Sequence, residues 1–397
     1  MLPFRTLRCG VALAIFAYTT GKNAAATLRL DYEPAAIILQ KRRRPCVDGN
    51  AIVMTTTDAC KTAADSGLRK TQADTASLLE CRDLRKHYPV TSGVFGREVG
   101  RVRAVDGLNL HVDRGETYSL VGESGCGKST TGRMVLRLEK PTAGSVLMDG
   151  QDVNRLRGKA LAGFRRRAQV VFQDPYSSLN PRMTVGAIVE EGLTIHFPRM
   201  TPAEKRDKAA ELLALTGLDG SALDRYPHEF SGGQRQRVGL ARALATDPQF
   251  IVADEAVSAL DVSIQAQIIN LLRDLQERLG LAYLFIAHDL AVVRHLSHRV
   301  GVMYLGHLVE EGLVGDVFDR PLHPYTKALL SAIPEPEPGV ERKRIILSGD
   351  VPRADNPPRG CRFHTRCSYV MDKCREGEVP EFCVDGRRVK CLLYDGA

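Results

Sequence analysis

The stretch GESGCGKST, residues 122–130, decides the fold of this chain, because it completes the phosphate-binding pattern G-x-x-x-x-G-K-S. It follows ETYSLV at 116–121, a β-branched and apolar run typical of a buried strand, and it leads into a helical segment. Glycines accept positive φ, so successive backbone N–H groups can point at a phosphate. A glycine-rich turn without a ligand is the alternative, which the complete pattern after a strand disfavours. The predicted nucleotide-binding residues are Gly122, Glu123, Ser124, Gly125, Cys126, Gly127, Lys128, Ser129 and Thr130.

A second stretch, FIVADE at residues 250–255, adds acidic residues to this site. Its apolar part suits a central strand of a parallel sheet, and Asp254 and Glu255 follow at the carboxyl end, where open α/β sheets place their ligands. Two adjacent carboxylates alone would indicate an ordinary solvated strand end. With a phosphate loop upstream, whose Lys128 suits the β- and γ-phosphates and whose Ser129 suits Mg²⁺, they indicate a nucleotide site.

A third stretch, SGGQRQR at residues 231–237, lies just upstream of the acidic strand. Ser231 can cap a helix, and Gly232 and Gly233 permit close approach of a phosphate to the backbone. Together the three stretches resemble the ATP-binding cassette (ABC) ATPases. The resemblance implies an α/β fold, with a RecA-like P-loop NTPase core, an antiparallel β-subdomain, and an α-helical signature subdomain at roughly residues 174–245.

The resemblance also implies catalytic roles. Asp254, with Ser129 and Gln173, would bind Mg²⁺, and Glu255 would be the general base that polarises the attacking water. Gln173 follows a strand-like VVF, and His288 follows the apolar run AYLFIA. A lone glutamine or histidine would ordinarily be structural or exposed. Because of their placement relative to the three stretches, the resemblance implies that Gln173 senses Mg²⁺ and water and that His288 contacts the γ-phosphate.

In this family the signature residues cover ATP held by a partner subunit, so catalysis needs two cassettes face to face. Those residues here are Ser231, Gly232, Gly233 and Gln234, and Asp261 belongs to SALD at 258–261, which resembles the loop that bridges the two sites. Tyr88 fits the aromatic that stacks on adenine, although one aromatic near a strand end is more often packing. Ala256 replaces the usual proline, so we expect slightly looser positioning of Glu255 with activity retained.

The length and charge of the chain limit how many domains it can form and which partners it can bind. The 397 residues are expected to form an amino-terminal extension at 1–77, one cassette at 78–322 and a carboxyl-terminal extension at 323–397. The net charge of +8 is modest, and the basic runs lack interleaved aromatics, so nucleic acid binding is not indicated. No apolar stretch approaches the length that spans a bilayer.

The amino-terminal extension differs from the rest of the sequence. VALAIFAY at 11–18, after Arg5 and Arg8, resembles a secretory signal peptide, which does not suit an ATPase that needs cytosolic ATP. We expect translation to begin at Met54, with a mis-assigned start before it. A genuine disordered or membrane-touching extension is the alternative.

Five of the ten cysteines lie within the last forty residues, and none of them forms a C-x-x-C pair, so the common zinc-finger pattern is absent. This tail resembles the carboxyl extension of oligopeptide and dipeptide transporter ATPases. By that resemblance, four cysteines can hold a [4Fe–4S] cluster, while free thiols or zinc remain the alternatives. The four are Cys361, Cys367, Cys374 and Cys391.

Three stretches carry the resemblance to this peptide-transport branch: QDPYSSLNPRMTVG, ADEAVSALDVSIQAQ and HPYTKALLSAIP. It implies the ATPase subunit of a bacterial importer for di- or oligopeptides, or for nickel or glutathione. Its partners would be a second ABC ATPase, two transmembrane permeases and an extracytoplasmic solute-binding protein, with this chain on the cytoplasmic face of the inner membrane. A non-transport ABC ATPase of a soluble complex, similar to that of C–P lyase or associated with nucleic acid, is the alternative.

Overall fold

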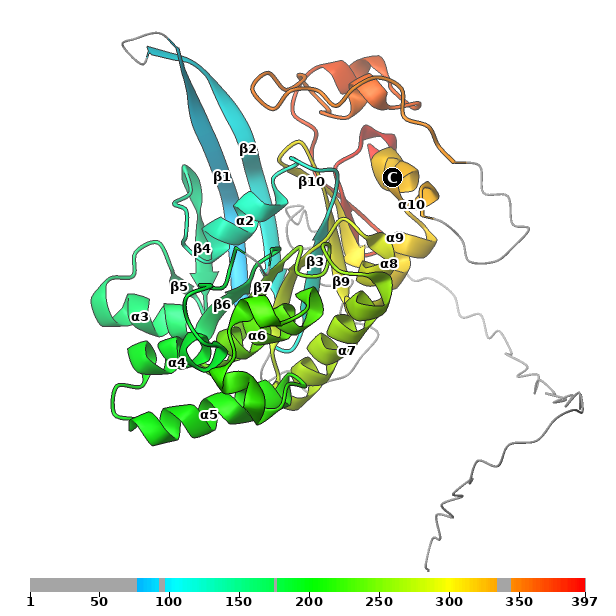
Figure 1. The fold of residues 1–397 in the computed structure, drawn as a ribbon. Helices are drawn as coiled ribbons and strands as arrows, with labels where there is room; N and C mark the ends of the chain where they lie inside the picture. The colour runs from blue at the N-terminus through cyan, green and yellow to red at the C-terminus, as the bar shows by residue number, and fades with distance from the viewer. Residues whose placement is uncertain (1–76, 93–96, 175–176, 334–343, 397) are drawn as a thin grey trace, which may run out of the picture. The chain divides into compact units, whose positions relative to one another are not determined.

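The computed structural model describes residues 77–396 apart from 93–96, 175–176 and 334–343 (Figure 1). The chain divides into two units, residues 1–53 and 54–397, and every described residue belongs to the second. The expected start at Met54 and the expected extension up to residue 76 therefore lie outside the described residues. Within the described part, none of the helices combines the length and the apolarity that crossing a bilayer requires.

A central sheet of eight strands runs in the order β11-β12-β10-β9-β3-β8-β7-β6. The five strands from β9 to β6 in this order are parallel. The inner strands β3, β8 and β7 are almost wholly buried, as expected of a sheet covered on both faces. The strands predicted at 116–121, 250–253 and 282–287 match them within one residue at each end. The bounds are β3 Thr117–Val121, β6 Ala168–Val171, β7 Phe250–Asp254, β8 Ala282–Ile286 and β9 Arg299–Tyr304.

Alternate residues of these strands feed two hydrophobic cores. On β7, Phe250 and Val252 belong to one core, whereas Ile251 and Ala253 belong to the other. This follows from the two-residue period of a strand, whose side chains point to opposite faces in turn. The parallel strands are therefore held from both sides, and their carboxyl ends are fixed in register.

A second sheet, in the order β2-β1-β4-β5, is antiparallel throughout. Its core residues, such as Leu84 and Leu108, share a cluster with Met134 and Val135 of α2, so this sheet packs on the helix that follows the phosphate loop. The bounds are β1 Leu79–Ser92, β2 Arg97–Val112, β4 Ala143–Met148 and β5 Gln151–Asp152.

Helices α4, α5 and α6 pack on one another and form a helical layer below the central sheet in Figure 1. Helix α7 ends at Leu279, and its C-cap Gly280 has a φ of +66°, a left-handed conformation that glycine adopts readily. The helix bounds are α2 Lys128–Val135, α3 Gly158–Arg167, α4 Val185–His196, α5 Pro202–Leu215, α6 Gly232–Leu244, α7 Val262–Leu279, α8 Leu290–Leu296, α9 Val314–Asp319 and α10 Pro324–Ser331.

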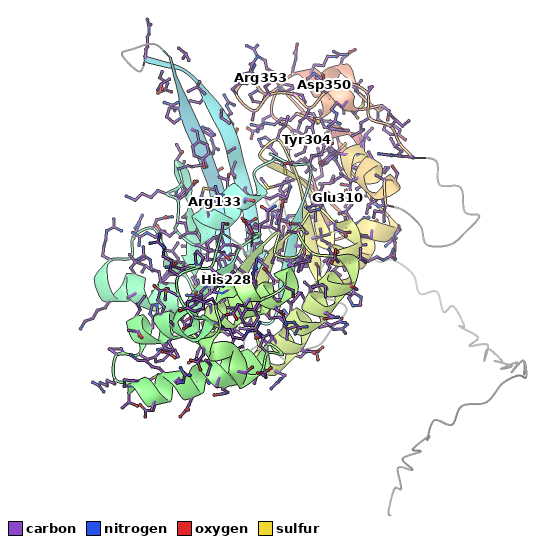
Figure 2. All side chains as sticks on the ribbon, viewed as in Figure 1. Arg133, His228, Tyr304, Glu310, Asp350 and Arg353 are labelled. Atoms are coloured by element: carbon purple, nitrogen blue, oxygen red, sulfur yellow. The ribbon has the colours of Figure 1, made fainter. Side chains whose placement is uncertain are left out.

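The carboxyl-terminal segment continues the central sheet instead of standing apart from it. Strand β12 (Arg387–Val389) pairs with β10 (His307–Leu313), and β11 (Phe382–Val384) pairs with β12. Glu310, labelled in Figure 2, is buried and lies 3.8 Å from the buried guanidinium of Arg387. A buried charge of this kind is stable only when paired, so this pair holds the last strands against the cassette.

Candidate functional site

The predicted site residues follow four neighbouring strands at one edge of the central sheet. The phosphate loop follows β3, His288 follows β8, and Gln173 follows β6, while Asp254 and Glu255 lie at the end of β7. In the sheet these strands stand side by side in the order β3-β8-β7-β6, all parallel. Carboxyl ends of parallel strands share one edge, so segments far apart in the chain converge there.

The phosphate loop requires glycine at two points for steric reasons. At Gly127, where φ is +111°, an added Cβ would lie 2.2 Å from the carbonyl oxygen of Ala104. At Gly122, where φ is +150°, it would lie 2.1 Å from that of Met303. The loop thus packs directly on the neighbouring backbone, and its curled shape is set before any ligand is considered.

Lys128 lies inside the curl of this loop. Its side chain is nearly fully buried, and its Nζ donates to the carbonyl oxygens of Gly122 (2.8 Å) and Glu123 (3.1 Å). Gly127 is the N-cap of α2, so the positive end of that helix faces the same space as the ammonium group. The arrangement concentrates positive potential at one point, as a phosphate group requires.

Two side chains with oxygen atoms that could bind a cation meet beside the phosphate loop. Ser129 Oγ donates to Oδ1 of Asp254 at 2.8 Å. Burial raises the pKa of Asp254, the hydrogen bond from Ser129 lowers it, and the neighbouring Glu255 carboxylate raises it again. A cation would relieve this crowding of negative charge, and hydroxyl and carboxylate oxygens are the ligands that Mg²⁺ prefers. The residues therefore fit a magnesium ion.

Glu255 has an unusual backbone conformation, with φ at +48°. Its N–H donates to the carbonyl of Ile286 on β8, and its carbonyl accepts from Ser258 Oγ, both at 2.9 Å. The side chain accepts from Gln173 Nε2 at 2.7 Å. A proline at position 256 would favour an extended conformation in the residue before it, so Ala256 is compatible with this left-handed one. Hydrogen bonds thus fix the backbone of Glu255 on both sides. They oppose the looser positioning of Glu255 that is expected from Ala256 in place of a proline.

Two other predicted residues are placed less tightly. His288 is exposed directly after β8, and no hydrogen bond joins it to another residue that the structure describes. Tyr88 lies on β1, where its hydroxyl donates to Glu139 and Lys86 Nζ stands 4.9 Å from the centre of its ring. Burial and then Glu139 raise the pKa of Tyr88, while the neighbouring Thr130 hydroxyl lowers it. Tyr88 is therefore close to the end of the phosphate loop.

The signature segment starts helix α6 with a reciprocal cap. Ser231 Oγ accepts from the N–H of Gln234 (3.3 Å), and Gln234 Oε1 accepts from that of Ser231 (3.0 Å). An added Cβ at Gly233 would lie 2.4 Å from Cγ2 of Ile264 on α7, so packing within the chain already demands this glycine. Asp261, the N-cap of α7, is exposed.

Within the described residues, no hydrogen bond joins the signature residues 231–234 to the phosphate loop at 122–130. Both segments are nonetheless fixed to the same rigid core, since α6 packs on β6 and α7. The structure therefore gathers the phosphate loop, Asp254, Glu255 and Gln173, and leaves the signature as a separate surface of the chain.

Three of the tail cysteines, Cys367, Cys374 and Cys391, lie close enough to Cys361 to influence its thiol. Burial, together with the smaller influence of the Cys391, Cys374 and Cys367 thiols, raises the pKa of Cys361 to about 11. Burial likewise raises the pKa values of Cys367 and Cys391. Cys383 lies exposed on β11. Among the described residues, no group of three or more His, Cys, Asp or Glu side chains is arranged for a single metal ion.

One contact of the phosphate loop could not be read from the sequence. Glu123 was assigned to the nucleotide, yet its side chain and N–H contact Arg366 and Tyr325 of the carboxyl-terminal segment. Tyr325 belongs to HPYTKALLSAIP, which ATP chemistry does not require. The presence of this motif outside the catalytic core is the one feature of the sequence that points to the contact with Glu123.

Similarity to known proteins identifies the family of this chain. The family model described as "ABC transporter" matches residues 105–258, and the model described as "Oligopeptide/dipeptide transporter, C-terminal region" matches residues 309–374. The solved structure "Dimeric Structure of MJ0796, a Bacterial ABC Transporter Cassette" is 32% identical, with a TM-score of 0.53. It covers 59% of this chain and 98% of its own, so the α/β cassette fold is shared.

Curated relatives match over a longer range. The "Oligopeptide transport ATP-binding protein AppF" of Bacillus subtilis (strain 168) is 52% identical over 82% of this chain and 99% of its own length. The "Dipeptide transport ATP-binding protein DppF" of Escherichia coli (strain K12) is 48% identical over 80% of this chain and 95% of its own length. With the phosphate loop, acidic strand and signature in one cassette, this chain belongs to the ABC transporter family of ATP-binding proteins.

Proposed function

We propose that this chain is the ATP-binding and ATP-hydrolysing subunit of an importer for di- or oligopeptides. The observation that carries the ATPase part is the convergence of the phosphate loop, Asp254, Glu255 and Gln173 at four adjacent parallel strand ends. The peptide part is supported by the relatives and by the match to the carboxyl-terminal region of peptide transporters. Nothing in the described residues favours a non-transport cassette ATPase.

The phosphate loop would bind ATP through its backbone N–H groups and Lys128. Ser129 and Asp254, with Gln173 close by, would hold Mg²⁺, which neutralises charge on the phosphates during transfer. Tyr88 would stack on the adenine from β1. Lys128 is already held within the loop by two carbonyls, so it needs little reorganisation to meet a phosphate.

Glu255 would act as general base toward the attacking water. Its carboxylate is only partly buried and already accepts one hydrogen bond, from Gln173. That bond leaves the second carboxylate oxygen to accept a proton, while Gln173 orients the water. His288, exposed at the next strand end, would contact the γ-phosphate and report its presence.

The signature residues Ser231, Gly232, Gly233 and Gln234, together with Asp261, would act on ATP held by a second ABC ATPase. Two facts support this: Ser231 and Asp261 are exposed, and a solved relative is a dimeric cassette. The capped start of α6 would present N–H donors and a helix dipole to the γ-phosphate across the interface.

The remaining partners would be two transmembrane permeases and an extracytoplasmic solute-binding protein, with the ATPase held peripherally at the cytoplasmic face of the bacterial inner membrane. The cassette would span 78–322, with the antiparallel sheet and the α4–α6 layer as its subdomains, followed by the extension at 323–397. Residues 1–77 would precede it. The nature of the cargo, including nickel or glutathione, is set by those partners.

We further propose that Cys361, Cys367, Cys374 and Cys391 hold a [4Fe–4S] cluster. Their number and type suit such a cluster, and Cys367, Cys374 and Cys391 lie near enough to Cys361 to influence its thiol. Anaerobically purified protein should absorb broadly at roughly 400 nm and contain iron and sulfide. Cys374→Ser should lose both, whereas Cys383→Ser, the matched control, should keep them. Zinc in place of iron would contradict the cluster.

Uptake tests the proposed function as a whole. A strain that lacks this chain should fail to take up labelled di- and oligopeptides, and the wild-type gene should restore uptake. Glu255→Gln should not restore it, although the protein accumulates normally. Peptide uptake that persists without the chain, or with Glu255→Gln alone, would show that this ATPase drives something else.

A further inference from the structure

The carboxyl-terminal segment grips the phosphate loop at Glu123. Arg366 donates from one guanidinium nitrogen to both carboxylate oxygens of Glu123, at 2.9 and 3.1 Å. Tyr325 Oη accepts from the backbone N–H of Glu123 at 2.8 Å. The carbonyl of the same residue accepts from Lys128. Glu123 therefore joins the catalytic lysine to two side chains that lie well outside the catalytic core.

Both of these side chains are rigidly held. Arg366 is 9% exposed, and Tyr325 is fully buried. Tyr325 packs in an aromatic cluster with Tyr304 and Phe363, with ring centres 4.7 to 5.4 Å apart. Offset aromatic contacts of this kind favour one arrangement of the rings. The hydroxyl that meets Glu123 thus has a fixed position relative to β9, which ends at Tyr304.

The segment around Arg366 is anchored to the cassette independently of Glu123. The guanidinium of Arg362 is buried, pairs with Asp106 on β2 and donates to the carbonyl of Leu305. The N–H of Arg103 donates to the carbonyl of Ala354 at 3.0 Å. These contacts make a stable base from which Arg366 reaches the loop.

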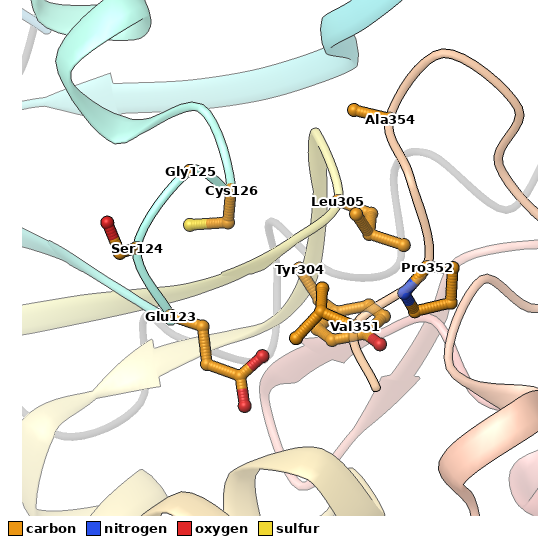
Figure 3. Close-up of a pocket in the computed structure, with 9 residues that line it drawn as sticks. All are labelled: Glu123, Ser124, Gly125, Cys126, Tyr304, Leu305, Val351, Pro352 and Ala354. Atoms are coloured by element: carbon orange, nitrogen blue, oxygen red, sulfur yellow. The ribbon is translucent and has the colours of Figure 1, made fainter. Parts of the chain in front are cut away.

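Figure 3 shows the same junction from the side of a cavity of about 190 Å³. The phosphate loop, from Glu123 to Cys126, forms one wall, and Val351, Pro352 and Ala354 form the opposite one. Tyr304, also labelled in Figure 2, lies between them. The carboxyl-terminal segment therefore covers the outer side of the loop, and Glu123 is the residue through which they bond.

Charge gives this contact a consequence for nucleotide binding. A carboxylate in the first half of a phosphate loop opposes an incoming polyanion, and in a partly buried setting such a charge is screened poorly. Arg366 neutralises that carboxylate. If Arg366 were removed while Glu123 remained, the carboxylate would again repel the phosphates of the nucleotide.

We propose that Arg366 and Tyr325 are positioning residues for ATP binding, which act through Glu123 by neutralising its charge and holding the first half of the phosphate loop. The carboxyl-terminal segment is then part of the nucleotide site, although it touches no nucleotide. This inference rests on the proposed nucleotide site, so its test includes a variant that reports on that site alone.

The test compares the affinities of ATP, ADP and adenosine for the purified full-length chain. Arg366→Gln should weaken the affinity for ATP by about tenfold or more, which corresponds to about 1.4 kcal/mol. The affinity for ADP should fall less, and that for adenosine should not change, because the effect acts on phosphate charge. Glu123→Gln alone should bind ATP at least as tightly as the wild type. The double variant should recover most of the loss.

That recovery separates charge from structure. If the pair only supported the fold, the double variant would be as weak as Arg366→Gln, and that result would overturn the charge role. Tyr325→Phe removes one hydroxyl and keeps the ring. It should therefore weaken the affinity for ATP a few-fold and leave the melting temperature unchanged. Unchanged affinity in Tyr325→Phe would overturn its positioning role.

Two reference variants complete the design. Lys373→Gln removes an exposed ion pair with Asp395 from the same segment and should leave all three affinities unchanged. Lys128→Ala should abolish ATP binding. If it does not, the proposed nucleotide site is wrong. If it does, while Arg366→Gln binds ATP normally, only the present inference is overturned.

Discussion

Gly127 shows how narrowly single residues of the phosphate loop are constrained. Its φ of +111° and the 2.2 Å approach to the carbonyl of Ala104 leave no space for a methyl group. Gly115 also has a positive φ, +68°, but an added Cβ there would meet nothing within 4 Å. Substitutions at these two glycines therefore distinguish the cost of backbone strain alone from the added cost of steric overlap.

We expect Gly115→Ala to lower the free energy of unfolding by about 1–2 kcal/mol, the cost of a left-handed conformation. Gly127→Ala should cost about 1–3 kcal/mol more, because β2 or the loop must move. Urea denaturation measures both, and only Gly127→Ala should also lose ATP binding. Equal stability losses in the two variants would show that the contact with Ala104 is not limiting.

At the scale of the residue, the sequence predicts which side chains gather at the strand ends, but it does not predict their backbone conformations. The hydrogen bond of Ser129 with Asp254 follows from two motifs at neighbouring strand ends, which a parallel sheet brings together. The positive φ of Glu255 does not follow, because it depends on the anchor at Ile286 on the adjacent strand. The requirement for Gly233 also escaped prediction, since it comes from contact with Ile264 on another helix.

Helices α5 and α6 start in the same way and allow a matched comparison at the scale of the element. Thr201 and Glu204 form a capping box at α5, and Ser231 and Gln234 form one at α6. Both caps are exposed, so each should contribute a similar amount to stability.

Thr201→Ala and Ser231→Ala should each lower the free energy of unfolding by about 0.5–2 kcal/mol. Only Ser231→Ala should also reduce the ATPase rate, since under the proposed function its helix start would face the phosphate held by a partner. Steady-state hydrolysis and thermal denaturation of both variants provide the measurement. A proportionate loss of activity in Thr201→Ala would mean that Ser231 contributes only stability.

Local elements could be predicted because their signals are local. The strands β3, β7 and β8 have unbroken apolar runs, and the end of α7 has a glycine with positive φ. Strands β11 and β12 were not predicted. They are short, and their place in the sheet depends on pairing with β10 across a long stretch of chain.

At the scale of the whole molecule, the signature and the phosphate loop are separate surfaces of one chain, and under the proposed function a complete site would require two chains. Mixing Lys128→Ala with a signature variant tests this. Gly233→Asp is unsuitable, because its Cβ would overlap Ile264, whereas an added Cβ at Gly232 meets only the end of Leu260 at 3.4 Å. Gly232→Asp also places a negative charge at a helix start, which favours the helix and repels phosphate.

Each variant alone should be nearly inactive, and an equal mixture should regain about a quarter of the wild-type rate, because half of randomly paired symmetric dimers carry one intact site of two. ATPase assays of the mixture measure this, with mixed dimers demonstrated by differently tagged chains. Mixed dimers without activity would contradict sharing between two copies. Full activity in a demonstrated monomer would contradict sharing altogether.

The central claim is that Lys128 binds and Glu255 hydrolyses ATP at one shared strand edge, and ATP affinity measured beside hydrolysis in three proteins tests it most directly. The wild type should bind and hydrolyse ATP. Lys128→Ala should lose binding, and Glu255→Gln should bind normally while hydrolysis falls by about 10²-fold or more. Unchanged ATP affinity in Lys128→Ala, or wild-type hydrolysis by Glu255→Gln, would contradict the account.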